Sequence, residues 1–520
     1  SVKPVQTYGP ELVTNGDFAT NSDWNSGPGW SISGGAANAS NSISYNRITQ
    51  AGAPITTTTL YKLTFTVFVI SGGIVPIVGS KLGSPISVSG TYTQYLTSTA
   101  TTTLIQIASN PSFTGSIDNV SVKEVLNADF DFTRNSSATR VGSNGLIQDV
   151  ASNLPRIDYT GGVGSWKFEP QRTNLIIRSE NYGHAAWSTF QSTILLSQNN
   201  TLTNQNDATL LYPSITSSYA SLFDANDLTS GIYTFSVFAK ASGKNFLCID
   251  DTIGGKNWFN LSNGTLGTIN SSYTANIENY SGGWYRCSVT NNSNATFNYT
   301  AVYLVTDTDN SLAITANGTD GILLFGSQTE AGSYPTSYII SNSGSATTRL
   351  ADVANNAGSS DLINSTEGVL YAEISALADD NNYRVIAISD GNTSNRVVID
   401  YSNTNKLRAF YAVNNILSAF FDIDYDIKQS SKILIKYKVN DFQFWVNGFK
   451  LGSDNSGAVL TGNTLNTLNF NFGGSSGGEF YGNTKCVAVF KEALTDLELE
   501  CLVSWMSFSD LGINFGYTVE

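Results

Sequence analysis

The chain has 520 residues, which is too long for a single hydrophobic core and predicts about three domains. Only 13% of the residues are charged whereas 41% are hydrophobic, a balance that suits folded β-rich cores with uncharged polar surfaces and argues against disorder. The formal net charge of −14 and the lack of a Lys/Arg cluster argue against nucleic acid as a partner, and no apolar stretch has the length of a membrane-spanning helix.

Alternating apolar residues predict a first block of β-strands over 11–125, after an N-terminal tail at 1–10. In LYKLTFTVFV (60–69), five apolar side chains share one face of the expected strand: Tyr61, Leu63, Phe65, Val67 and Val69. Trp24 and Trp30 lie in NSDWNSGPGW, a segment rich in Gly, Asn and Ser. Because flat indole faces pack against sugar rings, both are candidate carbohydrate-binding residues. The alternative is that they fold inward and plug the end of a sandwich.

Two similar phrases follow at distant points, SSATRV (136–141) and SATTRL (345–350). They lie in segments that separate the strand-rich blocks, 126–172 and 342–360, and we interpret both segments as connectors. We therefore expect the arginines of these segments to pair with nearby carboxylates or carbonyls rather than with a substrate. They are Arg134, Arg140 and Arg349.

The second strand-rich block covers 173–341 and contains the alternating segment YTFSVFAKA (233–241). Trp258 and Trp284 are further candidates for sugar binding, with core packing as the alternative. The four cysteines of the chain form no CxxC motif, so a zinc ribbon is excluded. They are expected to be small buried hydrophobic residues, and the sequence leaves disulfide pairing open: Cys248, Cys287, Cys486 and Cys501.

The third block covers 361–508 and is followed by a C-terminal tail at 509–520. Asn447 and Gly448 join two apolar-rich arms and predict a tight hairpin, because both residue types tolerate positive φ. The segment LTDLELECLVSWM (494–506) predicts one helix, with Thr495 and Glu498 as a capping box. Its expected apolar stripe is Leu497, Cys501, Leu502 and Trp505. Five side chains of this block are candidates for lining a sugar-binding groove: Tyr383, Arg384, Asn392, Trp445 and Tyr481.

Catalytic signatures are scarce. The single histidine, His184, has no GxSxG motif to accompany it, so neither a Ser-His-Asp triad nor a His-rich metal site is supported. Asp422, Asp424 and Asp426 alternate with apolar residues and would share one strand face, about 7 Å apart. A glycosidase pair flanks a scissile bond from separate elements, so a solvated strand face explains them better than catalysis, with a weak calcium site as the alternative. No enzymatic activity is expected.

The first block resembles carbohydrate-binding-module-like jelly rolls in its opening NGDF (15–18) and its closing IDNVSV (117–122). The resemblance implies that the two ends of the module lie adjacent and share a structural calcium ion. Asp17 and Asp118 are the ligands it indicates. The chain departs from the pattern at Ala19, where a glutamate commonly follows NGDF.

The connector DFDFTRNSSATRV (129–141) and the second block resemble bacteriophage fibre and virion-surface proteins. The second block shares with them SEN (179–181), AAW (185–187) and GGWYR (282–286). The third block resembles laminin-G/concanavalin-like sandwiches in FWVNGFKLG (444–452) and in its final helix.

These resemblances imply an extracellular adhesion protein on a virion surface, either a tail fibre or a head fibre. The implied partners are bacterial surface glycans and other virion proteins, in a homotrimer, without nucleic acid or membrane. Two alternatives remain: a glycan-degrading enzyme with accessory binding modules, and a capsid decoration that binds no glycan. The predicted fold is all-β, with tandem β-sandwich or jelly-roll domains and one short C-terminal helix.

Overall fold

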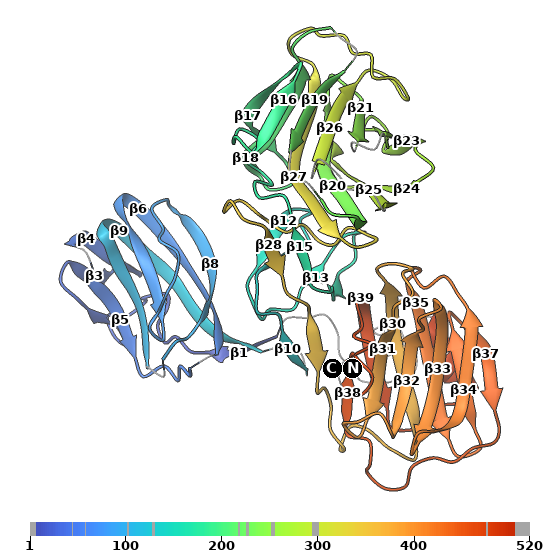
Figure 1. The fold of residues 1–520 in the computed structure, drawn as a ribbon. Coiled ribbons are helices and arrows are strands. Elements are labelled where there is room, and N and C mark those ends of the chain that lie inside the picture. The colour runs from blue at the N-terminus through green and yellow to red at the C-terminus, as the bar shows by residue number, and fades with distance from the viewer. Residues whose placement is uncertain are drawn as a thin grey trace. The chain divides into compact units, whose positions relative to one another are not determined.

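The computed structural model describes residues 7–43, 45–57, 59–100, 103–126, 130–216, 219–224, 228–250, 255–293, 301–474 and 477–504. The chain divides into two units, Val5–Ala128 and a larger one formed by Ser1–Pro4 and Asp129–Glu520. Apart from one α-helix and a single 3-10 turn, the described secondary structure is β-strand, as predicted (Figure 1). No described helix is long and apolar enough to cross a membrane. The predicted tail at 509–520 and the first six residues of the N-terminal tail lie outside the described residues.

The N-terminal unit is built around two long strands, β6 (Leu60–Val78) and β9 (Leu104–Leu126), which pair antiparallel along most of their length. The remaining strands are β1 (Thr7–Glu11), β2 (Asn25–Ser26), β3 (Trp30–Ser33), β4 (Ala36–Ile43), β5 (Arg47–Ala51), β7 (Lys81–Leu82) and β8 (Gly90–Thr97). The predicted alternation in β6 is confirmed in its first half, because Tyr61, Leu63, Phe65 and Val67 are all buried.

The second block forms a sandwich of two six-stranded antiparallel sheets, whose strand orders are β16-β19-β26-β21-β22-β23 and β17-β18-β27-β20-β25-β24. Their bounds are β16 (Trp187–Phe190), β17 (Ser192–Asn200), β18 (Gln205–Pro213), β19 (Ala220–Asp224), β20 (Gly231–Ser242), β21 (Phe246–Asp250), β22 (Asn257–Asn260), β23 (Thr265–Ile269), β24 (Tyr273–Asn279), β25 (Tyr285–Ser293), β26 (Ala301–Thr306) and β27 (Gly321–Ala331). A 3-10 turn, η1 (Ser281–Gly283), precedes β25.

The third block is a sandwich of a five-stranded sheet, β34-β33-β32-β31-β38, and a seven-stranded sheet, β13-β14-β39-β30-β35-β36-β37. Its strands are β30 (Glu367–Ala376), β31 (Arg384–Ser389), β32 (Arg396–Tyr401), β33 (Lys406–Val413), β34 (Ile416–Asp424), β35 (Ser431–Lys438), β36 (Phe442–Val446), β37 (Phe449–Asp454), β38 (Thr467–Asn469) and β39 (Gly482–Phe490). The helix α1 (Asp496–Ser504) packs on the seven-stranded sheet through Leu499, Leu502 and Val503.

Two local predictions for this block are confirmed. Asn447 and Gly448 both have positive φ, 47° and 88°, and connect β36 to β37 as a tight hairpin. The hydroxyl of Thr495 accepts a hydrogen bond from the Glu498 N–H, and the Glu498 carboxylate accepts one from the Thr495 N–H, which makes the predicted capping box. The predicted apolar stripe of the helix is wrong at its first residue, because Leu497 is exposed. Trp505 lies outside the described residues.

The two connector segments form one structural element, although they lie about 200 residues apart in the sequence and were expected to act as separate connectors. Their strands are β10 (Asp131–Thr133), β11 (Ala138–Val141), β12 (Ile147–Val150), β13 (Ile157–Asp158), β14 (Ser165–Lys167), β15 (Arg172–Asn174), β28 (Thr347–Arg349) and β29 (Val353–Asn355). The first segment pairs with the second twice, β10 with β29 and β15 with β28. It also adds β13 and β14 to the edge of the seven-stranded sheet beside β39. We call this element the paired connector.

Candidate functional site

The tryptophans of the first block are core residues. Trp24 is 7% exposed and its ring packs against Phe18, with centroids 5.1 Å apart. Its indole N–H donates to the carbonyl of Asn15 at 3.0 Å, and that of Trp30 donates to Asn46 at 3.3 Å. A sugar ring could not reach these indole faces without opening the core. The structure therefore agrees with the alternative in which Trp24 and Trp30 plug the sandwich.

The other three candidate tryptophans are also buried: Trp258, Trp284 and Trp445. Trp284 packs among buried side chains of the second sandwich, including Leu202 and Phe238. Trp445 packs beneath α1, and its indole N–H donates to the Gln443 side chain at 2.9 Å. In this structure none of the three offers an open ring face to a ligand.

Of the three further candidates, Arg384 and Tyr481 are in contact, whereas Asn392 bonds within its own loop. Arg384 is buried, and its guanidinium binds the Asp380 carboxylate at 2.6 Å and the Tyr481 carbonyl at 2.8 Å. Tyr481 is half-buried, and burial raises the pKa of its hydroxyl to about 12. Asn392 lies exposed after β31, where its amide oxygen accepts the Ser394 N–H. Arg384 is thus a structural side chain rather than a ligand-binding one.

The two predicted calcium ligands lie at the adjoining ends of the first block. The Val120 N–H donates to the Gly16 carbonyl at 2.8 Å, so the NGDF and IDNVSV segments are neighbours, as the resemblance implies. The Asp118 carboxylate accepts bonds from both the N–H and the amide of Asn119, and Asp17 accepts a long one from Ala19. Among the described residues no three His, Cys, Asp or Glu side chains form a group that could hold a metal. A calcium ion here would need main-chain carbonyls beside the two aspartates, so the ion stays a prediction, and no part of the proposed function uses one.

The connector arginines have protein partners, as predicted. Arg134 binds Asp352 at 3.0 Å, and Arg349 binds Glu169 at 2.7 Å. Arg140 donates weakly to the Ile157 carbonyl and the Gln148 side chain.

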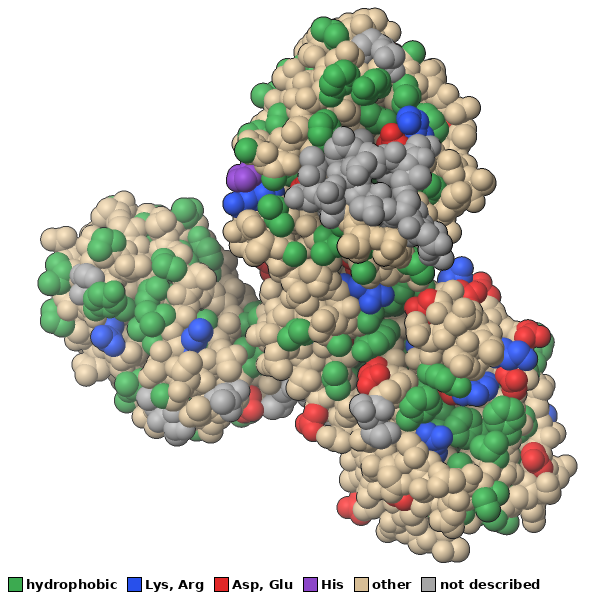
Figure 2. Space-filling view, in the orientation of Figure 1, with side chains coloured by type: hydrophobic (Ala, Val, Ile, Leu, Met, Phe, Trp, Pro, Cys, Tyr) green, Lys and Arg blue, Asp and Glu red, His purple; other side chains and the backbone are tan. Residues whose placement is uncertain are grey.

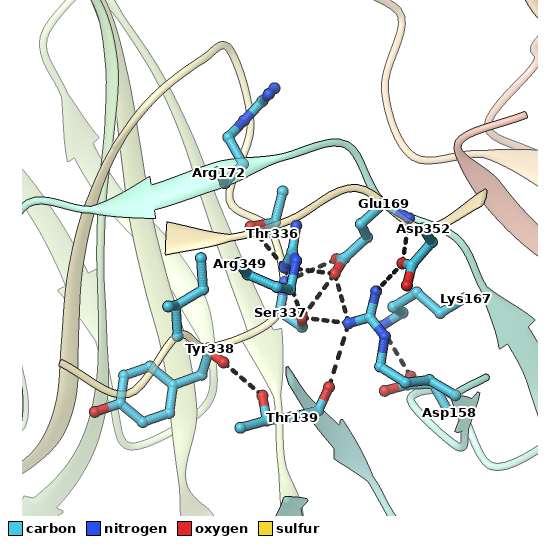
Figure 3. A network of polar contacts seen from close by, with 12 residues as sticks. Thr139, Asp158, Lys167, Glu169, Arg172, Thr336, Ser337, Tyr338, Arg349 and Asp352 are labelled. Atoms are coloured by element: carbon cyan, nitrogen blue, oxygen red, sulfur yellow. Dashed lines mark hydrogen bonds and ion pairs between the residues drawn. The ribbon is translucent and has the colours of Figure 1, made fainter. Parts of the chain in front are cut away.

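A fourth arginine, Arg156, joins these pairs into one network. Figure 3 shows Glu169, Asp352 and Arg349 of this network. It donates to Glu169 at 2.7 Å and also to Asp352, and every charged group of the network is almost inaccessible to water. Ser337 supplies two more donors to Glu169. Buried charges are costly unless they are fully paired, so this network is a structural clamp within the paired connector.

A polar cleft of about 370 Å³ adjoins this network, lined by the paired connector, β24, β25 and the third sandwich. Among its carboxylates, Asp158 binds Lys167 at 2.9 Å and Glu169 belongs to the clamp. Burial raises the pKa of Asp158, but the Lys167 charge and hydrogen bonds outweigh it and lower that pKa. Asp158 is therefore held ionised, which does not suit a general acid.

A second cavity, of about 320 Å³, lies on the outer face of the five-stranded sheet. The strand register explains it: Phe410 of β33 lies opposite Val398 of β32 and Phe420 of β34, so these three side chains share one face. The same register aligns Arg396, Ala412 and Leu417 in a neighbouring row. We call this cavity the outer-face groove. It is lined by Tyr383, Thr393, Arg396, Arg408, Phe410, Ala412, Asn415, Leu417, Phe420 and Phe472.

Aromatic rings form much of the lining of the outer-face groove. Tyr383 and Phe472 make an edge-to-face pair 5.3 Å apart, and the Phe410 and Phe420 centroids are 6.3 Å apart. Phe420 is 45% exposed, although large apolar side chains are normally turned inward. Figure 2 shows hydrophobic side chains gathered over this sheet, with basic side chains among them. The groove therefore combines open ring faces with hydrogen-bond donors, which is what sugar binding requires.

Of the predicted site residues, only Tyr383 lines this groove. The sequence analysis missed Arg396, Phe410, Phe420 and Phe472. A signal was present, because the hairpin KLRAFYAV–ILSAFF places aromatic residues on both faces of its strands, whereas only one face of a sandwich sheet meets the core.

No family model matches this chain, and no curated protein matches it in sequence. Among solved structures it is similar to the IT-sialidase CBM40 of Ruminococcus gnavus, with 11% identity over 29% of this chain and 94% of that one, at a TM-score of 0.25. It is also similar to a heptameric SAP-like pentraxin from Limulus polyphemus, with 14% identity over 30% and 76% of the two chains and a TM-score of 0.24. It is also similar to a tandem of two CBM22 modules from Paenibacillus barcinonensis Xyn10C, with 9% identity over 64% of this chain and 100% of that one and a TM-score of 0.20. Two of the three are thus carbohydrate-binding modules. Scores this low carry no inference about a ligand.

Proposed function

We propose that this chain is a structural adhesion protein of a bacteriophage particle, which binds glycans of the host surface through the outer-face groove. The observation that carries the binding site is the groove itself, where the exposed ring of Phe420 and the half-buried rings of Tyr383 and Phe472 lie beside the donors of Arg396. The virion assignment depends on the sequence motifs of the connector and the second block. In this proposal the chain holds and displays binding surfaces and performs no catalysis.

The paired connector supports a display role. Its buried clamp ties residues that are about 200 positions apart, since Arg156 and Asp352 are separated by 196. Its strand β14 also extends the sheet of the third sandwich. Such connections fix the connector to the domain that carries the groove, whereas a flexible linker would leave that domain free to turn.

Binding of the purified chain to host cells tests the groove. We expect Phe420→Ala to weaken binding by at least about tenfold, because a central aromatic contact is lost. Leu497→Ala is the matched control, since Leu497 is an exposed apolar side chain on α1, away from the groove lining. Equal binding by both variants would remove this site from the proposal.

The alternatives give different results in the same assay. A glycan-degrading enzyme would release soluble sugar fragments from host polysaccharide, and a non-binding decoration would leave the cells unlabelled. Immunogold labelling of intact particles tests the virion assignment, and light scattering of the purified chain tests the expected homotrimer.

A further inference from the structure

The lining of the outer-face groove is more basic than the protein as a whole. Its lining contains two arginines, Arg396 and Arg408, and no carboxylate. The chain as a whole carries a net charge of −14, but exposed charges farther away than about 8 Å are largely screened at physiological ionic strength. A ligand in the groove therefore meets a locally basic surface on an acidic protein.

Arg408 is already neutralised by the protein. Its guanidinium donates two hydrogen bonds to the carboxylate of Asp400, one of them at 2.8 Å and the other shorter. Asp400 is fully buried, so this pair is fixed in the sheet. The Arg408 guanidinium also lies 5.3 Å from the Tyr383 ring centroid and supports that aromatic wall.

Arg396 is different. Among the described residues it makes no ion pair, and its guanidinium donates a hydrogen bond from Nη1 to the Phe472 carbonyl at 2.9 Å. Its Nε is buried without a hydrogen-bond partner. The guanidinium is held between two rings, 5.3 Å from the Phe410 centroid and 5.6 Å from that of Phe472. It is thus positioned in advance without an ion-pair partner of its own, since Asp400, whose charge also acts on it, is bound to Arg408. An anionic ligand could pair with the guanidinium at its Nη atoms.

We propose that the outer-face groove selects glycans that carry a carboxylate, with Arg396 pairing with that carboxylate while the sugar ring packs on the exposed aromatic side chains. This inference rests on the proposed function and names its ligand class. A carboxylate is favoured over a phosphate monoester, because only one groove arginine lacks an ion-pair partner and a carboxylate carries a single negative charge, whereas the monoester carries nearly two. The planar fork of the guanidinium matches the two carboxylate oxygens.

The test compares acidic sugars with neutral partners, by calorimetric titration of the full chain. The probes are tri-galacturonate against its methyl ester, and sialyllactose against lactose. We expect at least one acidic member to bind ten times more tightly than its neutral partner, with a preference that weakens as salt rises. The methyl ester is the stricter control, because it keeps the ring and hydroxyl pattern and removes the charge at the cost of one added methyl group per carboxyl.

Arg396→Gln should abolish this preference, and Arg396→Lys should retain part of it because the charge remains. Thr393→Ala is a neutral change in the same lining and should keep the preference, which controls for disturbance of the groove. Equal binding of each acid and its neutral partner, a preference that survives Arg396→Gln, or no binding of any probe would each overturn the inference. Host-cell binding that depends on Phe420 would still stand in those cases, so the two failures are distinguishable.

Discussion

Arg134 and Asp352 lie 218 residues apart in the sequence, and their side chains meet at 3.0 Å inside the paired connector. Asp352 also accepts hydrogen bonds from Arg156 and from the Glu169 N–H. One buried carboxylate therefore joins both connector segments. Asp352 is buried. Phe168, which directly precedes Glu169, belongs to an aromatic cluster with Phe130, Trp166 and Phe470.

Removing this carboxylate should destabilise the larger unit strongly. We expect Asp352→Ala to lower the free energy of unfolding by about 3–5 kcal/mol, because it leaves buried guanidinium groups without a counter-charge. Denaturant unfolding of the full chain measures the loss, and hydrogen exchange shows whether the connector strands β10 and β29 open first. Asp424→Ala is the control, because Asp424 is 93% exposed and its pair with Lys406 is solvated, so a change within about 1 kcal/mol is expected. Similar effects of the two substitutions would contradict the clamp.

The clamp also predicts how stability depends on pH. Burial by itself raises the pKa of Glu169, but the charges of Arg349 and Arg156 outweigh it and hold that pKa well below its ordinary value of 4.5. The folded state therefore binds the Glu169 proton less readily than the unfolded state does. The resulting stabilisation is fully present above pH 4.5 and is lost as the pH falls through the folded value.

We expect the melting temperature of the larger unit to fall progressively below about pH 4.5, and to fall less steeply in Glu169→Gln. Some slope should remain, because the pKa of Asp158 is also lowered by its pair with Lys167. Calorimetric scans between about pH 2 and 6 provide the measurement. An acid slope that is unchanged in Glu169→Gln would show that another carboxylate dominates.

The fold class could be predicted from the sequence, because alternation, the hairpin at Asn447 and the capping box at Thr495 are local signals. The pairing of the two connector segments could not, since single-sequence patterns contain no information on contacts across 218 positions. The tryptophans were misleading for a physical reason. A polar, glycine-rich neighbourhood indicates a loop, and loop residues are usually exposed. The Trp24 ring is nevertheless buried, because its indole N–H finds a partner in the Asn15 carbonyl of the same loop. The outer-face groove combines side chains from several strands and appears only when their register is known.

Trp24 and Phe420 should therefore have opposite phenotypes. Trp24→Ala removes a buried indole and should cost about 3–5 kcal/mol of stability in the N-terminal unit. Host-cell binding per folded molecule should remain unchanged, because the Trp24 side chain is buried and cannot contact a ligand. Phe420→Ala should reduce binding and change stability little. Melting curves and cell-binding isotherms on the same preparations provide both measurements. A loss of binding by folded Trp24→Ala protein would return the first block to the candidate site.

The calcium expectation for the first block can be tested directly. A ligand that binds only the folded state stabilises it, by about 2.7 kcal/mol when its concentration is 100 times the dissociation constant. Since Asp17 and Asp118 gather no third acidic ligand among the described residues, we expect the melting temperature of the N-terminal unit to be the same in calcium and in a chelator. The melting temperature of Asp118→Ala should likewise be the same in calcium and in the chelator. A rise in melting temperature with calcium that disappears in Asp118→Ala would mean that main-chain carbonyls complete the site, and the resemblance would then hold for the ion as well as for the adjoining strand ends.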